Sequence, residues 1–524
     1  MHERFNAEER AVLERYVTNV DGSVFVLKNL PEVVKGALFA RYSRSAKSLK
    51  RLLLDEFLDK DAGETQEVAA GAARGEKLYD KVFIEYGDDS VAQLGGVHIA
   101  CEGASNILTK VLEWGRLAAY LEQSTRYVPY TDRPDGRWKY HVPAELSGAL
   151  RDQYVAAMDE AFETYARLIE PLSEHFAREN PKPEGGSERA YKNSIRAKAL
   201  DALRGLLPAS TQSNVGIYAT GQAYEMMLLR MRAAPEQEVR DYADAMLVEL
   251  RKVIPAFMKR VDQENRGVVW TDYLSSTRDA VARVTNEVVT AEAADVAEVE
   301  LTEFDPDGEV KVVAAALYAT SRLPDRQLLE IARAMSREER ERVLVAYVGE
   351  RKNRRHKPGR AFERTHYRFD VLSDYGAFRD LQRHRLLSLE WQPLCPHHGY
   401  VMGESVAAAG AEADFARVMK NTKAAYEAIA DAGLSHVAPY AVPMAYRVRY
   451  YLHMNAREAM HMLELRTAPQ GHASYRRVCQ AMHRLLIDEA KHEALAGAMK
   501  YVNHEAVALE RLAAEEAAEK RRQG

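Results

Sequence analysis

Two separate stretches of the chain collect residues that bind anions. Residues 122–127 read E-Q-S-T-R-Y, and residues 382–388 read Q-R-H-R-L-L-S. Guanidinium groups bind phosphate in a bidentate manner and stay charged at any working pH, while serine hydroxyls add further donors. Either stretch alone would carry little information, because arginine-rich runs are common in a chain with 73 lysines and arginines. Found at matching places of a repeat, they predict a site for phosphates and an electron-rich ring.

Such a repeat is present, and it keeps its order along the chain. Segment 37–44, A-L-F-A-R-Y-S-R, recurs as A-L-Y-A-T-S-R at 316–322, and Arg116 and Arg230 align with Arg385 and Arg466. The offsets are 279 (316 minus 37), 269 (385 minus 116) and 236 (466 minus 230), so the first half carries extra residues. Two tandem copies of one domain, with boundaries 1–275 and 276–524, explain this order most simply.

Length and composition are those of a soluble globular protein. A chain of 524 residues exceeds what one hydrophobic core usually organises, which agrees with two domains. The net charge of −5 argues against a dedicated nucleic-acid binder, and no apolar run reaches membrane length. Three cysteines are too few and too scattered for a disulfide framework or a cysteine zinc site. With no signal peptide visible, we expect a cytoplasmic protein that binds neither nucleic acid nor membranes.

Helix signals dominate the apolar pattern. Apolar residues recur at spacings of three and four in the runs 31–57, 144–176, 197–207, 237–261, 325–348, 412–432 and 475–500. Strand-like runs are shorter and lie at 82–86, 95–100, 268–271 and 365–371. Breakers predict loops at 130–136, 180–186 and 304–308, a domain border is expected near 271–286, and 505–524 reads as a charged, fraying helix. The expected fold class is α+β, with a helix-rich domain and a small antiparallel or mixed sheet in each copy.

The two anion-binding stretches resemble the two ends of one known signature. Flavin-dependent thymidylate synthases (ThyX) carry R-H-R-x-x-S-x-x-E-x-S-x-R, and the resemblance covers most of each half of this chain. In the first copy Trp114 and Gly115 replace the first arginine and the histidine, whereas Glu122, Ser124 and Arg126 keep the far end. The signature is therefore incomplete in this copy.

The second copy shows the opposite loss. Arg383, His384 and Arg385 keep the near end of the signature together with Ser388, but W, P and C stand at 391, 393 and 395. Ordinary members of the family resemble a single copy and assemble as homotetramers, with sites built across subunit borders. A fused pair that lost redundant halves can therefore retain hybrid sites, and the expected particle is a homodimer.

The resemblance also implies a role for each retained residue. The first copy supplies residues for the phosphate and sugar of dUMP, namely Glu122, Ser124, Arg126, Arg204 and Arg230. The second copy supplies residues for FAD, namely Arg383, His384, Arg385, Asn455 and Arg457, and Arg466 is the expected catalytic residue. The implied reaction is the methylation of dUMP to dTMP with methylenetetrahydrofolate as carbon source and NADPH as reductant.

Elementary chemistry agrees with this division. A phosphate dianion needs several donors, and Ser124 with Arg126, Arg204 and Arg230 offers one hydroxyl and three permanent cations. A reduced flavin carries negative charge near its N1, which a guanidinium stabilises. No cysteine is paired with a base in the sequence pattern, which fits a mechanism in which the flavin replaces a protein thiol.

Two other interpretations remain open at this stage. Glu458-x-x-His461 and Glu489-x-x-His492 each place a carboxylate and an imidazole on one helix face, as in di-iron carboxylate proteins. That site also needs glutamates from two further helices, and C-P-H-H at 395–398 lacks a fourth zinc ligand, so we expect no metal. Alternatively, the lost signature residues mark a degenerate flavin- or nucleotide-binding protein without catalysis.

Overall fold

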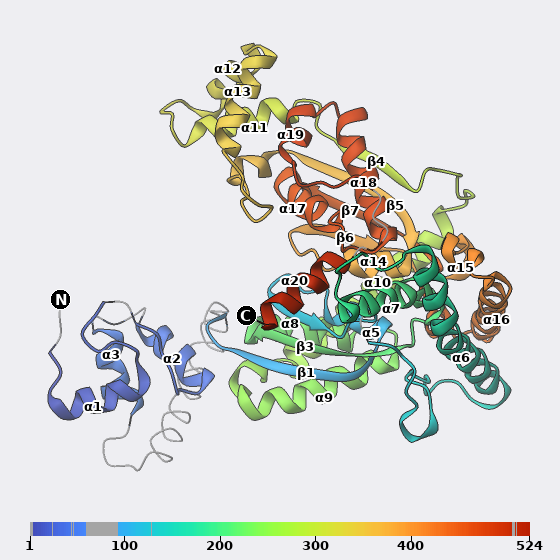
Figure 1. Ribbon diagram of the computed structural model, residues 1–524. Coiled ribbons are helices and arrows are strands. Elements are labelled where there is room, and N and C mark those ends of the chain that lie inside the picture. The colour runs from blue at the N-terminus through green and yellow to red at the C-terminus, as the bar shows by residue number, and fades with distance from the viewer. Residues whose placement is uncertain are drawn as a thin grey trace. The chain divides into compact units, whose positions relative to one another are not determined.

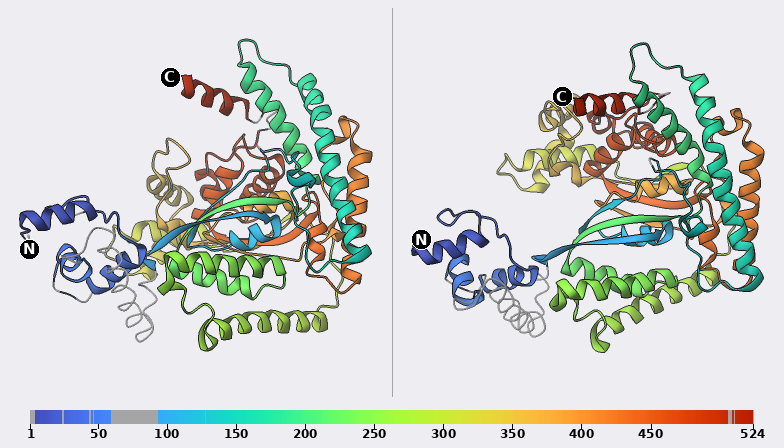
Figure 2. Two further views of the ribbon diagram at one scale, coloured as in Figure 1. Left: turned by 90° about the horizontal axis from the view of Figure 1, so that it is seen from below. Right: turned by 60° about the horizontal axis from the view of Figure 1, so that its bottom comes forward.

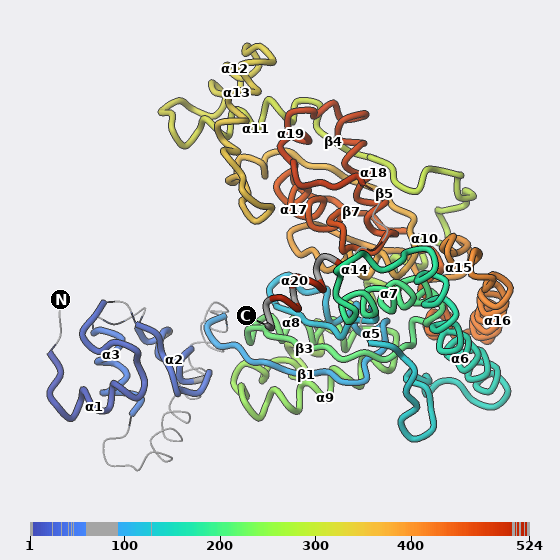
Figure 3. Tube along the Cα trace, viewed as in Figure 1, coloured from blue at the N-terminus to red at the C-terminus, as the bar shows by residue number. Residues whose placement is uncertain are grey.

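The computed structural model describes residues 4–23, 25–42, 45, 47–58, 93–126, 128–505, 509 and 511–523. Figures 1 and 3 show the course of the chain. The chain forms two compact units that exchange segments: unit 1 contains 1–104, 111–122 and 213–291, and unit 2 contains 105–110, 123–212 and 292–524. The predicted strand at 82–86 lies outside the described residues. The predicted domains 1–275 and 276–524 are defined by the sequence copies, and their border stays a prediction.

Unit 1 contains a three-stranded sheet in the order β1-β3-β2. Its strands are β1 (Gly96–Ser105), β2 (Ala118–Glu122) and β3 (Gln212–Thr220), and β2 pairs antiparallel with β3. Its described helices are α1 (Ala7–Tyr16), α2 (Glu32–Tyr42), α3 (Leu49–Leu52), α8 (Gly221–Arg232), α9 (Gln237–Val253) and α10 (Val269–Val288). Helix α5 (Asn106–Leu112) carries the chain between the units.

Unit 2 contains a four-stranded sheet in the order β4-β5-β7-β6. The strands are β4 (Val299–Phe304), β5 (His366–Asp374), β6 (Leu387–Trp391) and β7 (Arg447–Asn455), and all neighbouring pairs are antiparallel. Alternate residues of β5 and β7, among them Phe369 and Leu452, are fully buried. The sheet therefore has one face against the helical core, as expected for an antiparallel sheet.

The helices of unit 2 come from both sequence copies. They are α6 (Gly148–Glu179), α7 (Glu188–Leu203), α11 (Gly308–Tyr318), α12 (Asp325–Ala334), α13 (Arg337–Val348), α14 (Tyr375–Leu381), α15 (Glu404–Ala408), α16 (Glu412–Asp431), α17 (Ala456–Arg466), α18 (Ala473–Asp488), α19 (Glu493–Ala498) and α20 (Leu512–Gln523). Helix α6 of the first copy packs beside α16 of the second, as both views of Figure 2 show. The buried side chains of Tyr154, Met158, Ala425 and Ile429 lie in the core cluster that joins them.

The two copies repeat one topology, which confirms the tandem duplication. Apart from α7 in the first copy and α15 in the second, the order β1, α5, β2, α6, β3, α8, α9 recurs as β5, α14, β6, α16, β7, α17, α18, and the sheet order β1-β3-β2 recurs as β5-β7-β6. Helices α5 and α14 begin 269 residues apart (375 minus 106), the offset that aligns Arg116 with Arg385. The expected α+β class with two small sheets is thereby confirmed.

Several predicted elements differ from the structure in detail. Residues 268–271 are helical at the start of α10, because a four-residue apolar run cannot distinguish a strand from a helix. The predicted helix at 325–348 is two helices, because Ser336 caps the start of α13. The predicted helix at 475–500 is also two helices, α18 and α19. The expected border near 271–286 falls within α10 and stays a prediction. None of the described helices has the length and apolar character needed to cross a membrane.

Candidate functional site

An arginine cluster in unit 2 surrounds the partly buried carboxylate of Asp380. Arg204 Nη1 lies 3.3 Å from Asp380 Oδ2, and Arg466 Nη1 lies 3.8 Å from Oδ1. Burial alone would raise the pKa of Asp380, but the charges of Arg204, Arg383, Arg466 and Arg126 hold it well below its usual range. The carboxylate therefore stays ionised and joins arginines of the first copy to arginines of the second.

Helix ends position the members of this cluster. Arg204 follows the last residue of α7, and Arg466 is the last residue of α17. Asp380 lies in the last turn of α14, a helix whose start is fixed by Asp374, because its side chain accepts from the Ala377 N–H at 2.9 Å. Short helices with defined ends thus direct the charged side chains toward one another.

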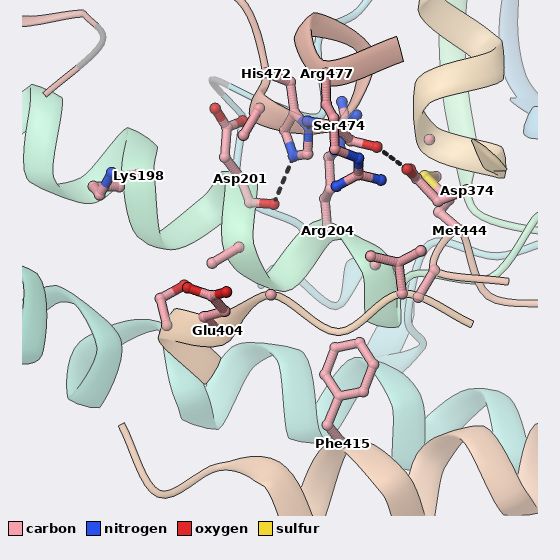
Figure 4. A pocket seen from close by; sticks show the side chains of 18 of the residues that line it. Lys198, Asp201, Arg204, Asp374, Glu404, Phe415, Met444, His472, Ser474 and Arg477 are labelled. Carbon is pink, nitrogen blue, oxygen red and sulfur yellow. Dashed lines mark hydrogen bonds between the residues drawn. The ribbon is translucent and has the colours of Figure 1, made fainter. Parts of the chain in front are cut away.

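Arg204 presents unsatisfied donors to a pocket of about 480 Å³. Its side chain is buried, and its Nε and Nη2 have no hydrogen-bond partner among the described residues. Figure 4 shows it among His472, Ser474 and Asp374. A Cβ at Gly376 would lie 3.2 Å from Arg204 Nη2, so a glycine at this position leaves room for the guanidinium. Buried donors without partners are costly, which makes this guanidinium suited to an anionic ligand.

The polar groups around Arg204 have defined protonation states. His472 Nδ1 accepts from the Ser474 N–H at 3.1 Å, so Nε2 carries the proton and donates to the Asp201 carbonyl at 3.2 Å. Burial, aided by the charge of Arg204, lowers the pKa of His472 to about 3. Ser474 Oγ donates to Asp374, whose pKa burial raises. The pocket thus combines the permanent cation of Arg204 and the neutral imidazole of His472 with hydroxyl and carboxylate groups.

Arg126, the second predicted phosphate ligand, forms a bidentate ion pair with Asp201. Its Nε lies 2.9 Å from Oδ1 and its Nη2 lies 2.7 Å from Oδ2. Nη1 also donates to the Tyr475 hydroxyl at 3.1 Å. Arg511, near the C-terminus, donates to the same Asp201 oxygen at 2.8 Å. Although burial would raise the pKa of Asp201, the two guanidiniums lower it, so Asp201 holds Arg126 in place.

Arg466 is oriented by a chain of hydrogen bonds through His384. Arg466 Nε donates to His384 Nε2 at 3.0 Å, so the imidazole proton is on Nδ1, which donates to Glu458 Oε1 at 2.8 Å. Burial, and then the neighbouring Arg466, lower the pKa of His384 to about 4 despite Glu458. Burial would raise the pKa of Glu458, but hydrogen bonds from His384 and His461 lower it to about 2. The imidazole is therefore neutral and accepts from Arg466.

The same residues are the one described group with the composition of a metal site. Candidate ligand atoms of His384, Glu458 and His461 lie within 4.8 Å of one another. Metal binding through His384 Nδ1 would move the proton to Nε2, where it would oppose the N–H of Arg466. Glu489 and His492 do not join this group, and His492 Nδ1 instead contacts the Tyr367 hydroxyl at 2.7 Å. The described geometry gives no support to a di-iron centre.

The remaining flavin-type residues lie in two places, at the start of α17 and in the turn before β6. Asn455 caps α17 through the Glu458 N–H at 2.9 Å, and Arg457 Nε donates to the Pro358 carbonyl at 2.9 Å. Arg383 and Arg385 are exposed in the turn between α14 and β6. Arg383 and Arg385 thus reach the surface, and Asn455 and Arg457 hold the local fold.

Two predicted substrate residues belong to unit 1. Glu122 is the buried last residue of β2, and Arg230 lies in the last turn of α8. The Arg230 guanidinium lies 5.0 Å from the centre of the Trp114 ring, and burial lowers its pKa. Ser124, in contrast, belongs to unit 2, where its hydroxyl accepts from the Arg126 N–H at 3.2 Å.

Sequence reasoning missed several of these groups. Asp201 lies one helical turn before Arg204, and Asp380 lies three residues before Arg383, so proximity to a predicted residue was an available signal. His472 and Ser474 follow the Arg466 helix within eight residues. Arg511 is 310 residues from Asp201 along the chain, and no spacing pattern points to it.

Comparisons with known proteins match both copies. A family model described as thymidylate synthase complementing protein matches residues 33–256 and 300–490. A UPF0159 protein of Chlamydia muridarum is 37% identical over 517 residues, covering 97% of each chain. A flavin-dependent thymidylate synthase of Clostridium tetani is 25% identical over 182 residues, covering 34% of this chain and 67% of that enzyme.

Among solved structures, the chain matches a UMP/dUMP methylase, PolB, from Streptomyces cacaoi bound with 5-Br dUMP. The TM-score is 0.30 with 21% identity, and the match covers 39% of this chain and 96% of that one.

Proposed function

Because the chain belongs to the thymidylate synthase complementing protein family, we propose that it methylates dUMP to dTMP using FAD, methylenetetrahydrofolate and NADPH. The similarity to a flavin-dependent thymidylate synthase supports the choice of reaction. The arginine cluster supports the choice of an anionic substrate. We place the nucleotide phosphate at Arg204 and assign Arg466 as the catalytic residue.

The observation that carries this proposal is the unsatisfied Arg204 guanidinium in its pocket. Nε and Nη2 form one edge of the guanidinium, which is the arrangement that binds phosphate in a bidentate manner. Within the cluster, Arg126, Arg204 and Arg466 outnumber the carboxylates of Asp201 and Asp380 by one. The pocket lining adds Glu179, Asp374 and Glu404 as well as Lys198 and Arg477, so the unpaired edge of Arg204, rather than net charge, favours an anion.

The pocket itself has the dimensions of a small-molecule site. Its volume of about 480 Å³ falls within the range of roughly 300–1,000 Å³ that is usual for such sites. Neutral His472 and Ser474 lie beside Arg204, so they can exchange hydrogen bonds with sugar or base groups without repelling the phosphate. Phe415 and Met444 add apolar surface for a pyrimidine ring.

The flavin is assigned to the residues around the Q-R-H-R turn. Bound FAD would supply the redox chemistry that protein side chains lack. Exposed Arg383 and Arg385 provide cations for its phosphates, and Arg466, held by His384, provides an oriented guanidinium near Asp380. We also assign Asn455 and Arg457 to the flavin site, in addition to their hydrogen bonds to the Glu458 N–H and the Pro358 carbonyl.

A homodimer is proposed as the active particle, on the basis of the two copies in each chain. Four copies are then brought together in one particle with two-fold symmetry. Light scattering on the purified protein tests this directly, and a stable, active monomer would contradict it.

A spectrum followed by a turnover assay tests the function. Purified protein should be yellow with flavin absorption, and dUMP should perturb that spectrum on titration. With methylenetetrahydrofolate and NADPH added, chromatography should detect dTMP, whereas Arg466→Ala should bind both ligands and form little product. Binding without any product would favour the degenerate flavin- or nucleotide-binding protein, and colourless protein that ignores dUMP would refute both.

A further inference from the structure

The segment beyond the family match contributes a charged side chain to the site. The family model ends at residue 490, whereas Arg511 is 4% exposed and lies among residues of the nucleotide-type half. Its Nη2 lies 2.8 Å from Asp201 Oδ2, and its Nη1 donates to the Arg126 carbonyl at 3.0 Å. Arg511 therefore touches both members of the ion pair that borders the Arg204 pocket.

Helix α20 fixes this arginine in place. The helix begins at Leu512, directly after Arg511, and packs against α7, the helix that carries Asp201. Glu519 accepts from the Ser187 hydroxyl at the start of α7, and Glu515 lies 3.5 Å from the Asn193 side-chain amide. The docking of one helix on another thus sets the position of one side chain in the site.

Sharing of Asp201 changes the net charge around Arg126. With a single guanidinium on a carboxylate, the two charges largely cancel in the pocket nearby. Here Oδ1 accepts from Arg126, and Oδ2 accepts from Arg126 and Arg511 together. The carboxylate is divided between two cations, so the group of Arg126, Asp201 and Arg511 carries one net positive charge toward a ligand, whereas Arg126 and Asp201 alone would carry none.

We propose that Arg511 is a positioning residue that raises the affinity of the Arg204 pocket for phosphate-bearing ligands by drawing the Asp201 charge away from Arg126. This inference rests on the proposed function for the identity of the nucleotide, though not for the anionic character of the ligand. It assigns a binding role to a C-terminal segment outside the matched family regions. The role is electrostatic, since Arg511 acts through Asp201 rather than on the ligand.

The test compares a ligand with a phosphate and the same ligand without one. Titration calorimetry of the FAD-loaded protein would measure dUMP and deoxyuridine binding to the wild type, Arg511→Gln and Arg511→Lys. The Gln variant should bind dUMP about three- to tenfold more weakly with deoxyuridine unchanged, because one positive charge beside Asp201 is lost, and Lys should restore part of the loss. The dUMP deficit should narrow at high salt.

A matched control separates charge at the site from charge on the helix. Lys520→Gln removes a charge from an exposed position of the same α20 and should leave both affinities unchanged. Thermal unfolding of each variant reports whether the fold is kept. An Arg511→Gln variant that binds dUMP normally, or loses dUMP and deoxyuridine equally, would overturn the proposal.

A failure of the proposed function can be distinguished from a failure of the role of Arg511. Wild-type protein that binds no dUMP would refute that function. In that case, protection of the wild type and the Gln variant by inorganic phosphate during thermal unfolding decides the role of Arg511. Stronger protection of the wild type supports it, and equal protection overturns it.

Discussion

The turn before β2 and the turn before β6 hold the same place in the repeat, but they have different chemistry. In unit 1 the Arg230 guanidinium lies over the Trp114 ring, and the adjacent Gly115 has no side chain. In unit 2 Arg466 donates to His384, which occupies the position equivalent to Gly115. Arg230 of α8 and Arg466 of α17 reach the equivalent turn, so the frame is retained, but the guanidinium meets an indole ring in unit 1 and an imidazole in unit 2.

A one-residue shift accompanies this difference. Helices α8 and α17 begin 235 residues apart (456 minus 221), whereas Arg230 and Arg466 are 236 apart. One residue turns a helix position by about 100°. Arg230 therefore leaves α8 at a different angle, and its Nε has no hydrogen-bond partner among the described residues. The second-copy turn, with Arg466, His384 and Asp380, is the half that we propose for the cofactor and catalysis.

The largest expected effect is on nucleotide binding. Arg204→Ala should weaken dUMP binding about ten- to a hundredfold, since a charged hydrogen bond contributes about 1.5–3 kcal/mol. Lys192→Ala removes an exposed charge of α7 outside the pocket lining, so it is the control and should change the affinity less than threefold. Calorimetry on both variants measures the difference, and equal losses would contradict the placement of the phosphate at Arg204.

Flavin retention should distinguish the two turns. Arg385→Ala should lower FAD affinity roughly tenfold, because an exposed cation of the second-copy turn is lost. Arg116 is the exposed counterpart in the first copy, and Arg116→Ala should retain FAD. Fluorescence of released flavin after gel filtration gives the comparison. Similar retention by both variants would remove the assignment of FAD to the second copy.

The buried imidazole of the second-copy turn should make stability depend on pH. The pKa of His384 is about 4 in the folded protein, against 6.5 for an ordinary histidine, so the unfolded chain binds more protons between these values. The free energy of unfolding should fall as the pH decreases from about 6.5 to about 4, by up to about 3 kcal/mol from this group.

His384→Gln removes this titration and should lessen the slope in that range, to which His472, with a pKa of about 3, also contributes. Urea unfolding at several pH values measures it. Loss of the Glu458 contribution follows at lower pH, as its carboxylate protonates between its usual value and about 2. An unchanged slope in the Gln variant would mean that His384 is not the buried neutral group described here.

The smallest effect is expected from metal ions. Zn²⁺ or Fe²⁺ at micromolar concentration should shift the melting temperature by less than about one degree, since Arg466 directs its N–H at His384 Nε2. His461→Ala serves as the control. A large stabilisation that disappears in His461→Ala would establish a metal site in this turn.

Sequence periodicity located the repeat and most helices, but it could not locate all of their ends. The break between α12 and α13 was readable, because Ser336 and Glu339 form a capping box. The helical state of residues 268–271 could not be predicted, since the Val-Val-Trp run has the composition of a strand. Local pattern thus failed where side-chain composition and tertiary context disagreed.

The candidate site was predictable in part. Motif residues such as Arg204 and Arg466 were found from the sequence, and unit 2 brings them together around Asp380. Their partners were missed, because a buried carboxylate between guanidiniums has no periodic signature. Arg511 was beyond prediction: the tail was expected as a charged, fraying helix, and only the packing of α20 on α7 places it beside Asp201.

The number of nucleotides bound by each chain tests the central claim most directly. If nucleotide residues of the first copy and flavin residues of the second form the functional site, calorimetry of FAD-loaded protein with dUMP should give one nucleotide per chain. Trp114 and Gly115 cannot replace Arg383 and His384 in the opposite combination. A stoichiometry of two would contradict the account, because both copies would then hold complete nucleotide sites.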